Sequence, residues 1–248
     1  MEAVRRHLPP GTAEYVAGLF AAEPLEAAGV EVSVVRARRS KLGDHRGPTS
    51  GRTAHRITVN EDLNPFAFLT TLLHEIAHAV TWERHERFRR RFARRVLPHG
   101  PQWKGEFGRI LEPVLDDGLL PPDVAGALAH YLRNPRAATC SDRGLVVALS
   151  RYDIPDPVRV RVEEVPQGAT FRVEGGRTFL KGPKLRSRFR CYEAGSNAEY
   201  RIHGLCRVEP CHAVPDAAID VRLSHSRAVP HPADQASRGG KRRPTRLS

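Results

Sequence analysis

Residues 64–80 read NPFAFLTTLLHEIAHAV, and this stretch predicts one amphipathic helix. Asn64 can cap its first turn, and Pro65 suits the first helical position, where no backbone donor is required. At about 100° per residue, six apolar side chains share one arc, with His74 and His78 just off its edge and Glu75 further round on the same side. The six are Phe66, Leu69, Leu72, Leu73, Ile76 and Val80. We therefore expect a helix packed on its apolar face, with both histidines at the border of the core.

The histidine spacing predicts a metal site of the hydrolytic kind. Two histidines four residues apart on a helix can direct a ring nitrogen at one zinc ion, while a glutamate after the first histidine reaches the water instead. Such a site needs a third protein ligand and an open position for water. Zinc lowers the pKa of that water toward ~7, and a carboxylate can take its proton as the water attacks a carbonyl. We predict His74 and His78 as zinc ligands and Glu75 as the general base.

The third ligand is sought among the remaining histidines. His85 shares a helical face with His74 and His78, but at ~1.5 Å per residue it lies ~10 Å further along a continuous helix. His130 stands among apolar residues and is expected to pack within a helix. His99 follows a helix end and precedes Gly100, so the chain can fold back there. His99 is therefore the best candidate.

Two segments resemble a known family. His74–His78, followed by Pro98-His99-Gly100-Pro101-Gln102-Trp103-Lys104, is similar to the SprT-like zinc metallopeptidases, which include the Spartan proteases of DNA–protein crosslinks. The resemblance covers about residues 35–106. It implies a zincin-like fold, His99 as third zinc ligand, and zinc-dependent endopeptidase activity on DNA-associated or DNA-crosslinked proteins.

The alternative is a SprT-like nucleic-acid- or transcription-associated binding protein with little or no proteolytic activity. An intact Glu75 favours the enzyme, because a purely structural metal site needs no general base.

The periodicity predicts an α+β protein in three parts. Residues 1–135 form a helix-rich metallopeptidase domain with a small antiparallel strand unit, residues 136–212 a small antiparallel β domain, and residues 213–248 a basic, disordered tail. In the first part we expect helices at 12–28, 64–80, 84–95, 102–113 and 122–133, strands at 30–37 and 54–60, and a loop at 40–53. In the second, short alternating runs begin near residue 157, and Glu174-Gly175-Gly176 predicts a hairpin turn.

The charge balance favours a polyanionic partner. The chain has 248 residues and a formal charge of +12, divided as +3, +5 and +4 over the three parts. Arg186, Arg188 and Arg190 alternate with apolar residues, so period-two spacing predicts three guanidinium groups on one strand face that could bind DNA phosphates. The alternatives are a merely solvated sheet edge and a protein-docking surface. A second basic stretch, Arg84–Arg95, adjoins the predicted site.

Four cysteines, at 140, 191, 206 and 211, are too few and too scattered for a disulfide framework. SprT-like proteins often end in a zinc ribbon of two Cys-x-x-Cys pairs, which this chain lacks, so we expect unliganded thiols and one catalytic zinc only. Apolar stretches are too short to span a membrane, and residues 1–7 lack the order of a secretory signal. We expect a cytoplasmic protein that acts on protein substrates near DNA.

Overall fold

A computed structural model of the chain describes residues 2–38, 41–87, 95–133, 135 and 142–211. The chain divides into two compact units, Met1–Pro157 and Val158–Ser248. This division falls later than the boundary expected after residue 135, because Leu145 is fully buried in the core of the first unit. The expected disordered tail, Cys140 and most of the basic stretch 84–95 lie outside the described residues.

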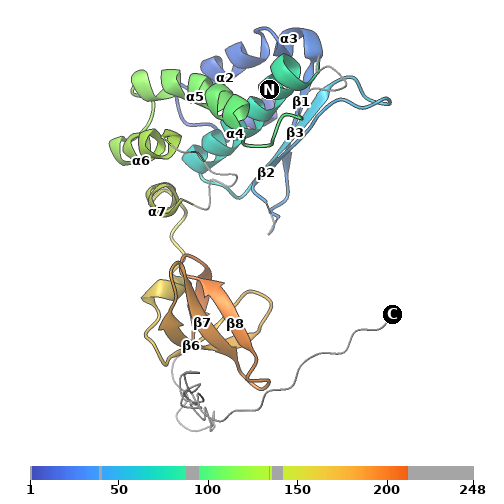
Figure 1. The fold of residues 1–248 in the computed structure, drawn as a ribbon. Helices are drawn as coiled ribbons and strands as arrows, with labels where there is room; N and C mark the ends of the chain where they lie inside the picture. The colour runs from blue at the N-terminus through green and yellow to red at the C-terminus, as the bar shows by residue number, and fades with distance from the viewer. Residues whose placement is uncertain (1, 39–40, 88–94, 134, 136–141, 212–248) are drawn as a thin grey trace, which may run out of the picture. The chain divides into compact units, whose positions relative to one another are not determined.

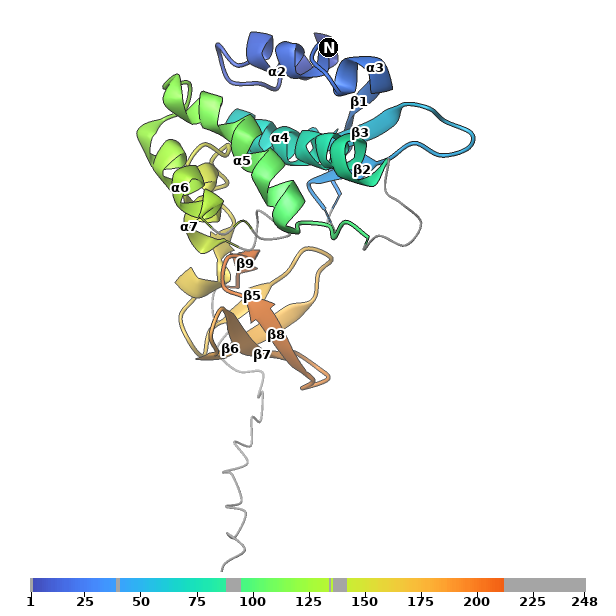
Figure 2. The same cartoon turned by 45° about the horizontal axis from the view of Figure 1, so that its top comes forward.

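The first unit combines helices with a three-stranded sheet (Figures 1 and 2), so the expected α+β class is confirmed. Helix α4 contacts β2 and β3 of the sheet and also α5, and α5 in turn contacts α6. In chain order the elements are α1 (Glu2–Arg5), α2 (Ala13–Phe20), α3 (Leu25–Ala28), β1 (Val30–Val35), β2 (Gly43–Arg46), β3 (His55–Asn60), α4 (Pro65–Thr81), the π-helical turn η1 (Trp82–Glu86), α5 (Pro101–Asp116), α6 (Pro122–Leu132) and α7 (Arg143–Ser150).

Helix α4 is the centre of this unit. Asn64 caps it as predicted, since its side-chain oxygen accepts hydrogen bonds from the backbone N–H groups of Phe66 (3.1 Å) and Ala67 (3.0 Å). Burial extends beyond the predicted apolar arc, because Thr70, Thr71 and Glu75 are also buried. A helix buried on most sides has protein, rather than bulk water, around its polar side chains.

The sheet differs from the expected antiparallel strand unit. Strand β3 lies between β1 and β2, so β1 pairs with it in parallel and β2 in antiparallel orientation. The antiparallel expectation is wrong for the β1–β3 pair, because β3 inserts between two strands that the sequence order would make neighbours. Strand β2 falls in the expected loop 40–53. Its residues Gly-Asp-His-Arg have low strand propensity, and pairing with β3 overrides it.

Two helix predictions also need correction. The single helix expected over 12–28 is two, α2 and α3, because Pro24 has no N–H to continue a helix. Helix α7 was not predicted. Asp142 caps it by accepting a hydrogen bond from the backbone N–H of Leu145 (2.9 Å). The side chain of Leu145 packs in the hydrophobic core of the first unit.

The second unit is a six-stranded antiparallel sheet in the order β4-β9-β5-β6-β7-β8. Its strands are β4 (Val160–Arg161), β5 (Thr170–Arg172), β6 (Thr178–Lys184), β7 (Arg188–Glu193), β8 (Glu199–His203) and β9 (Arg207–Pro210). Gly175 and Gly176, both with positive φ, form the predicted turn between β5 and β6. A separate small core lies between its strands and includes Val162, Phe171, Phe179 and Cys191. This confirms the small antiparallel β unit.

In the described part of the chain, no helix is both long and apolar enough to cross a bilayer.

Asn64 does more than cap α4, because its side chain also contacts the end of α7. Its side-chain N–H₂ group also donates to the Leu149 carbonyl (3.0 Å) and to Asp153 (2.6 Å), which ties α4 to the end of α7. Losing a cap costs about 1 kcal/mol, and losing the two further hydrogen bonds costs roughly 0.5 kcal/mol each, at the lower end of the usual range. Asn64→Ala should therefore lower the free energy of unfolding in urea by about 2 kcal/mol. Asp142→Ala, which removes only the α7 cap, should lower it by about 1 kcal/mol. Equal losses in the two variants would contradict a linking role for Asn64.

Candidate metal centre

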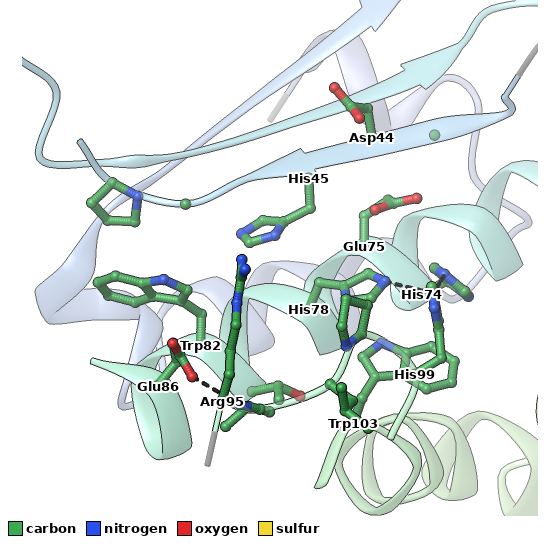
Figure 3. A pocket seen from close by; sticks show the side chains of 17 residues that line it. Asp44, His45, His74, Glu75, His78, Trp82, Glu86, Arg95, His99 and Trp103 are labelled. Carbon is green, nitrogen blue, oxygen red and sulfur yellow. Dashed lines mark hydrogen bonds between the residues drawn. The ribbon is translucent and has the colours of Figure 1, made fainter. Parts of the chain in front are cut away.

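Three histidines from two segments converge on one point (Figure 3). Nε2 of His99 lies 3.1 Å from Nε2 of His74 and 2.9 Å from Nε2 of His78. His74 and His78 belong to α4, and His99 precedes α5 by two residues. All three residues were predicted as ligands, and the structure brings their ring nitrogens together.

The two segments are held in place by local backbone structure. His74 and His78 lie one turn apart on α4, with ring centroids 5.0 Å apart. His99 adopts a left-handed backbone (φ 59°), which costs a residue other than glycine roughly 1–2 kcal/mol. Gly100 then caps α5 and Pro101 occupies its first position. This tight turn folds His99 back onto α4, as the His-Gly-Pro segment led us to expect.

Aromatic packing holds the imidazole rings. The ring of Trp103, fully buried, lies 4.6 Å from that of His74 and 4.7 Å from that of His99, centroid to centroid. Phe107 stacks on Trp103, with ring centroids 5.0 Å apart. Nδ1 of His74 is buried and has no hydrogen-bond partner within the described ranges, so packing rather than hydrogen bonding fixes this ring.

Burial keeps all three imidazoles neutral. Burial, together with a smaller contribution from the neighbouring histidines, lowers the pKa of His74 to about 3 and that of His78 to about 2. Burial lowers the pKa of His99 as well. A neutral imidazole can offer an unprotonated ring nitrogen, which is the form that binds metals.

The cluster could hold a metal ion, and its geometry suits one. A tetrahedral ion at about 2.0–2.1 Å from each nitrogen would separate the nitrogens by roughly 3.3 Å, a few tenths of an ångström more than observed. Among the described residues no other histidine, cysteine or carboxylate joins the cluster. The three nitrogens face a cleft of about 640 Å³. A fourth coordination position would therefore be open to that cleft.

The other histidines considered as ligands have different surroundings. His85 lies in η1 and pairs with Glu106 at 3.2 Å, away from the cluster. The expectation that His130 packs within the protein is wrong, because it is exposed on α6. The positive charge of the expected basic stretch Arg84–Arg95 is partly neutralised, since Glu106 also pairs with Arg84 at 2.9 Å.

Glu75 lines the same cleft and is strongly desolvated. Burial, with help from the charge of Asp44, raises its pKa to about 8, although Arg38 and Lys41 act in the opposite direction. Such a carboxyl sits near the balance between its acid and its base form at neutral pH, as a group that both takes and returns a proton should.

Gly43 on β2 leaves the space that the carboxyl group of Glu75 occupies. A Cβ atom at Gly43 would lie 2.7 Å from Oε1 of Glu75 and 2.7 Å from Cγ2 of Thr71. Only glycine lets the strand approach α4 this closely. Sequence analysis missed this role of Gly43 because it expected a loop at residues 40–53.

The rest of the cleft is of mixed character. Gly47 approaches the Trp82 ring on one wall, and Arg95 and Leu97 lie on the segment that leads to His99. His45 points into the cleft from β2, the strand that also carries Gly43 (Figure 3). Sequence analysis did not single out His45, and no local pattern marks it.

The predicted phosphate-binding arginines lie in the second unit. Arg188 and Arg190 both belong to β7, and Arg188 is exposed. Arg190 is half-buried and pairs with Glu199 at 3.4 Å. Arg186 is exposed but precedes the strand, in the turn after β6. The three guanidinium groups therefore do not form the single regular row that period-two spacing predicted.

The described cysteines, Cys191, Cys206 and Cys211, are all free thiols. Cys191 is fully buried in the second core.

No family model, curated protein or solved structure matches the chain.

The three-histidine cluster predicts binding of a single divalent ion. A ligand that binds only the folded state at 100 times its Kd stabilises that state by about 2.7 kcal/mol. Zn²⁺ should therefore raise the Tm of the wild type by several degrees and bind in a 1:1 ratio. In His99→Ala both effects should be lost, whereas His130→Ala, altered at an exposed histidine, should behave as wild type. Equal Tm shifts in all three proteins would place the ion elsewhere.

Proposed function

We propose that this protein is a zinc-dependent peptidase. The observation that carries the proposal is the position of Glu75, a buried carboxyl next in sequence to the ligand His74 and lining the same cleft. A metal site that served structure alone would have no use for such a group. Burying an ionisable carboxyl costs free energy, and that cost is accounted for if the carboxyl handles a proton.

Zinc is the ion best suited to the donor set. Three neutral imidazoles with one open position match catalytic zinc sites, whereas calcium and magnesium prefer oxygen ligands. His74, His78 and His99 would hold the ion. When bound, zinc supplies Lewis-acid activation of a water molecule and of a carbonyl group.

The chain's own contribution to hydrolysis is proton transfer and positioning. Glu75 accepts a proton from the attacking water and returns it to the nitrogen of the leaving amine. A cation bound at the histidines would favour the ionised form of Glu75 and so prepare it as a base. The close approach of Gly43 limits the space around this carboxyl and restricts its orientation.

We further propose that the chain is SprT-like and zincin-like. Support comes from the two segments that carry the resemblance, since the metal-binding helix and the His-Gly-Pro turn contribute to one cluster. Endopeptidase action on DNA-associated or DNA-crosslinked proteins would follow from membership of that family.

The central test uses Glu75→Gln, which keeps the size of the side chain but removes its basicity. The zinc-loaded wild type should cleave an unfolded basic protein, and a chelator should stop the cleavage. Glu75→Gln should bind Zn²⁺ in a 1:1 ratio and lose at least 100-fold in kcat/KM, in line with the weight of general-base catalysis. Cleavage by Glu75→Gln at the wild-type rate would contradict the proposal. If neither protein cleaves but both bind zinc and DNA, the non-proteolytic binding protein is favoured.

The DNA partner rests on the exposed arginines of the second unit and has its own test. Arg188→Ala should weaken binding of single-stranded DNA and lower the slope of log K against log salt by about 0.7, the value for one lost phosphate contact. Arg36→Ala, an exposed arginine of the first unit, is the matched control and should leave the slope unchanged. Equal effects of the two variants would indicate a diffuse charge effect without a binding face.

A further inference from the structure

A buried chain of hydrogen bonds connects the wall of the cleft to the interior of the first unit. Nε2 of His45 lies 2.8 Å from Nδ1 of His55, and Nε2 of His55 lies 2.9 Å from Oε1 of Glu83. The other carboxylate oxygen of Glu83 accepts a hydrogen bond from Arg87 at 2.7 Å. These hydrogen bonds therefore join β2, β3 and the turn η1 that continues α4.

The inner members of this hydrogen-bond network, His55 and Glu83, are buried. His55 is fully buried, and Glu83 is 3% exposed. Trp82 covers His55 edge-on, with ring centroids 5.3 Å apart. Glu83 lies in a π-helical turn, and such turns occur often at functional sites. Polar groups buried at this depth cost free energy unless each is hydrogen-bonded, so their arrangement is specific.

The direction of the hydrogen bonds follows from counting protons. Glu83, paired with Arg87, is a carboxylate that can only accept, so Nε2 of His55 carries the proton of that hydrogen bond. A neutral His55 then has a bare Nδ1, which accepts the N–H of His45 Nε2. A neutral His45 is thereby left with a bare Nδ1. Imidazole is mostly neutral at pH 7, so the two hydrogen bonds alone assign these roles to the ring nitrogens.

His45 stands beside the metal centre. Its ring lies parallel to that of the ligand His78, with centroids 6.0 Å apart and an interplanar angle of 9°. It lines the cleft together with Glu75 and His99 (Figure 3). The two nitrogens of an imidazole point in divergent directions, so Nδ1 is directed away from His55. No hydrogen bond to this nitrogen is recorded from the described residues.

We propose that His45 is a substrate-binding residue whose Nδ1 accepts a hydrogen bond from a main-chain N–H of the bound peptide. His55 and Glu83 are positioning residues that fix its tautomer. This inference rests on the proposed peptidase function and deepens it, because it assigns to the site a requirement in the substrate. At one position beside the cleaved bond the substrate needs an N–H group, so proline and ester-linked residues are disfavoured there.

A set of ester-substituted peptides tests the hydrogen bond directly. The parent is a peptide that the zinc-loaded wild type cleaves, and each analogue replaces one amide N–H, other than that of the cleaved bond, by an ester oxygen. Affinity is measured by calorimetry on zinc-loaded Glu75→Gln, which does not cleave, and kcat/KM on the wild type. One analogue should bind and react about five- to tenfold more weakly than the parent, as expected for one lost hydrogen bond.

The same peptides are then compared on His45→Phe, which keeps a flat ring but has no acceptor. The affinity and kcat/KM for the parent peptide should fall about five- to tenfold relative to the wild type. The sensitive analogue should bind and react no more weakly with His45→Phe than the parent does. His130→Phe, altered on the exposed face of α6, should keep the wild-type pattern. Zinc content and Tm are measured for each variant, because a purely structural role of His45 would change these and leave the response to the ester unaltered.

The outcomes distinguish failure of the proposed role of His45 from failure of the proposed peptidase function. Cleavage by the wild type with no sensitive position, or with the same sensitivity in His45→Phe, overturns the role of His45 and leaves the peptidase intact. Should the ester set on the wild type show a sensitive position while His45→Phe fails to fold, the test passes to His45→Ala, which removes the ring and with it the acceptor nitrogen. Sensitivity retained in His45→Ala overturns the proposal. Absence of Glu75-dependent cleavage of the parent peptide removes both proposals.

Discussion

The first unit depends on the burial of α4 between the sheet and α5. Leu69, Leu72, Leu73 and Ile76 are almost wholly removed from solvent, and each contributes roughly 1.5–3 kcal/mol by burial. That stabilisation is what permits the same helix to carry His74 and Glu75 at 7% and 8% exposure. Polar side chains gain nothing from such positions by themselves. The apolar face fixes the helix, and the helix in turn imposes desolvation on the groups at its border.

Desolvation then determines the chemistry of the cleft. It drives basic and acidic groups toward their neutral forms. The imidazoles therefore lose their protons, and Glu75, whose pKa is raised to about 8, retains its proton at neutral pH. Three imidazole nitrogens brought together, with separations of 2.9–3.1 Å from His99 to each of the other two, can all direct lone pairs at one cation, whereas a proton held among them can be bound by only one at a time. A cation there would also reverse the balance at Glu75. One physical cause, the loss of water around α4, therefore accounts for both the metal-binding capacity and the poised carboxyl.

The features that sequence alone predicted are those encoded within a few residues. The Asn64 cap, the i and i+4 histidines and the turn at Gly175-Gly176 each depend on neighbours in the chain, and each is confirmed. The insertion of β3 between β1 and β2 depends on pairing between distant segments, which periodicity does not report. The same holds for α7, whose packing on α6 and α4 moved the unit boundary to Pro157, and for the link from His45 to Glu83. Sequence therefore predicted the three histidines that come together in the cluster but not the strand that forms the wall of the cleft.

Strand β2 shows why that wall could not be read from composition. Its side chains alternate between the two faces of the sheet, so Gly43 meets Glu75, Asp44 turns away to pair with Lys41 and Arg46, and His45 returns to the cleft. A shift of register by one residue would set Asp44 against Glu75, where two carboxylates would repel, and would turn His45 out of the cleft. Pairing with β3 fixes the register, in which His45 lies opposite Ile57, and the bond from His45 reaches diagonally to His55, two residues along β3 on the same face. The hydrogen bond that orients His45 is thus also a constraint on the register that keeps Gly43 beneath Glu75.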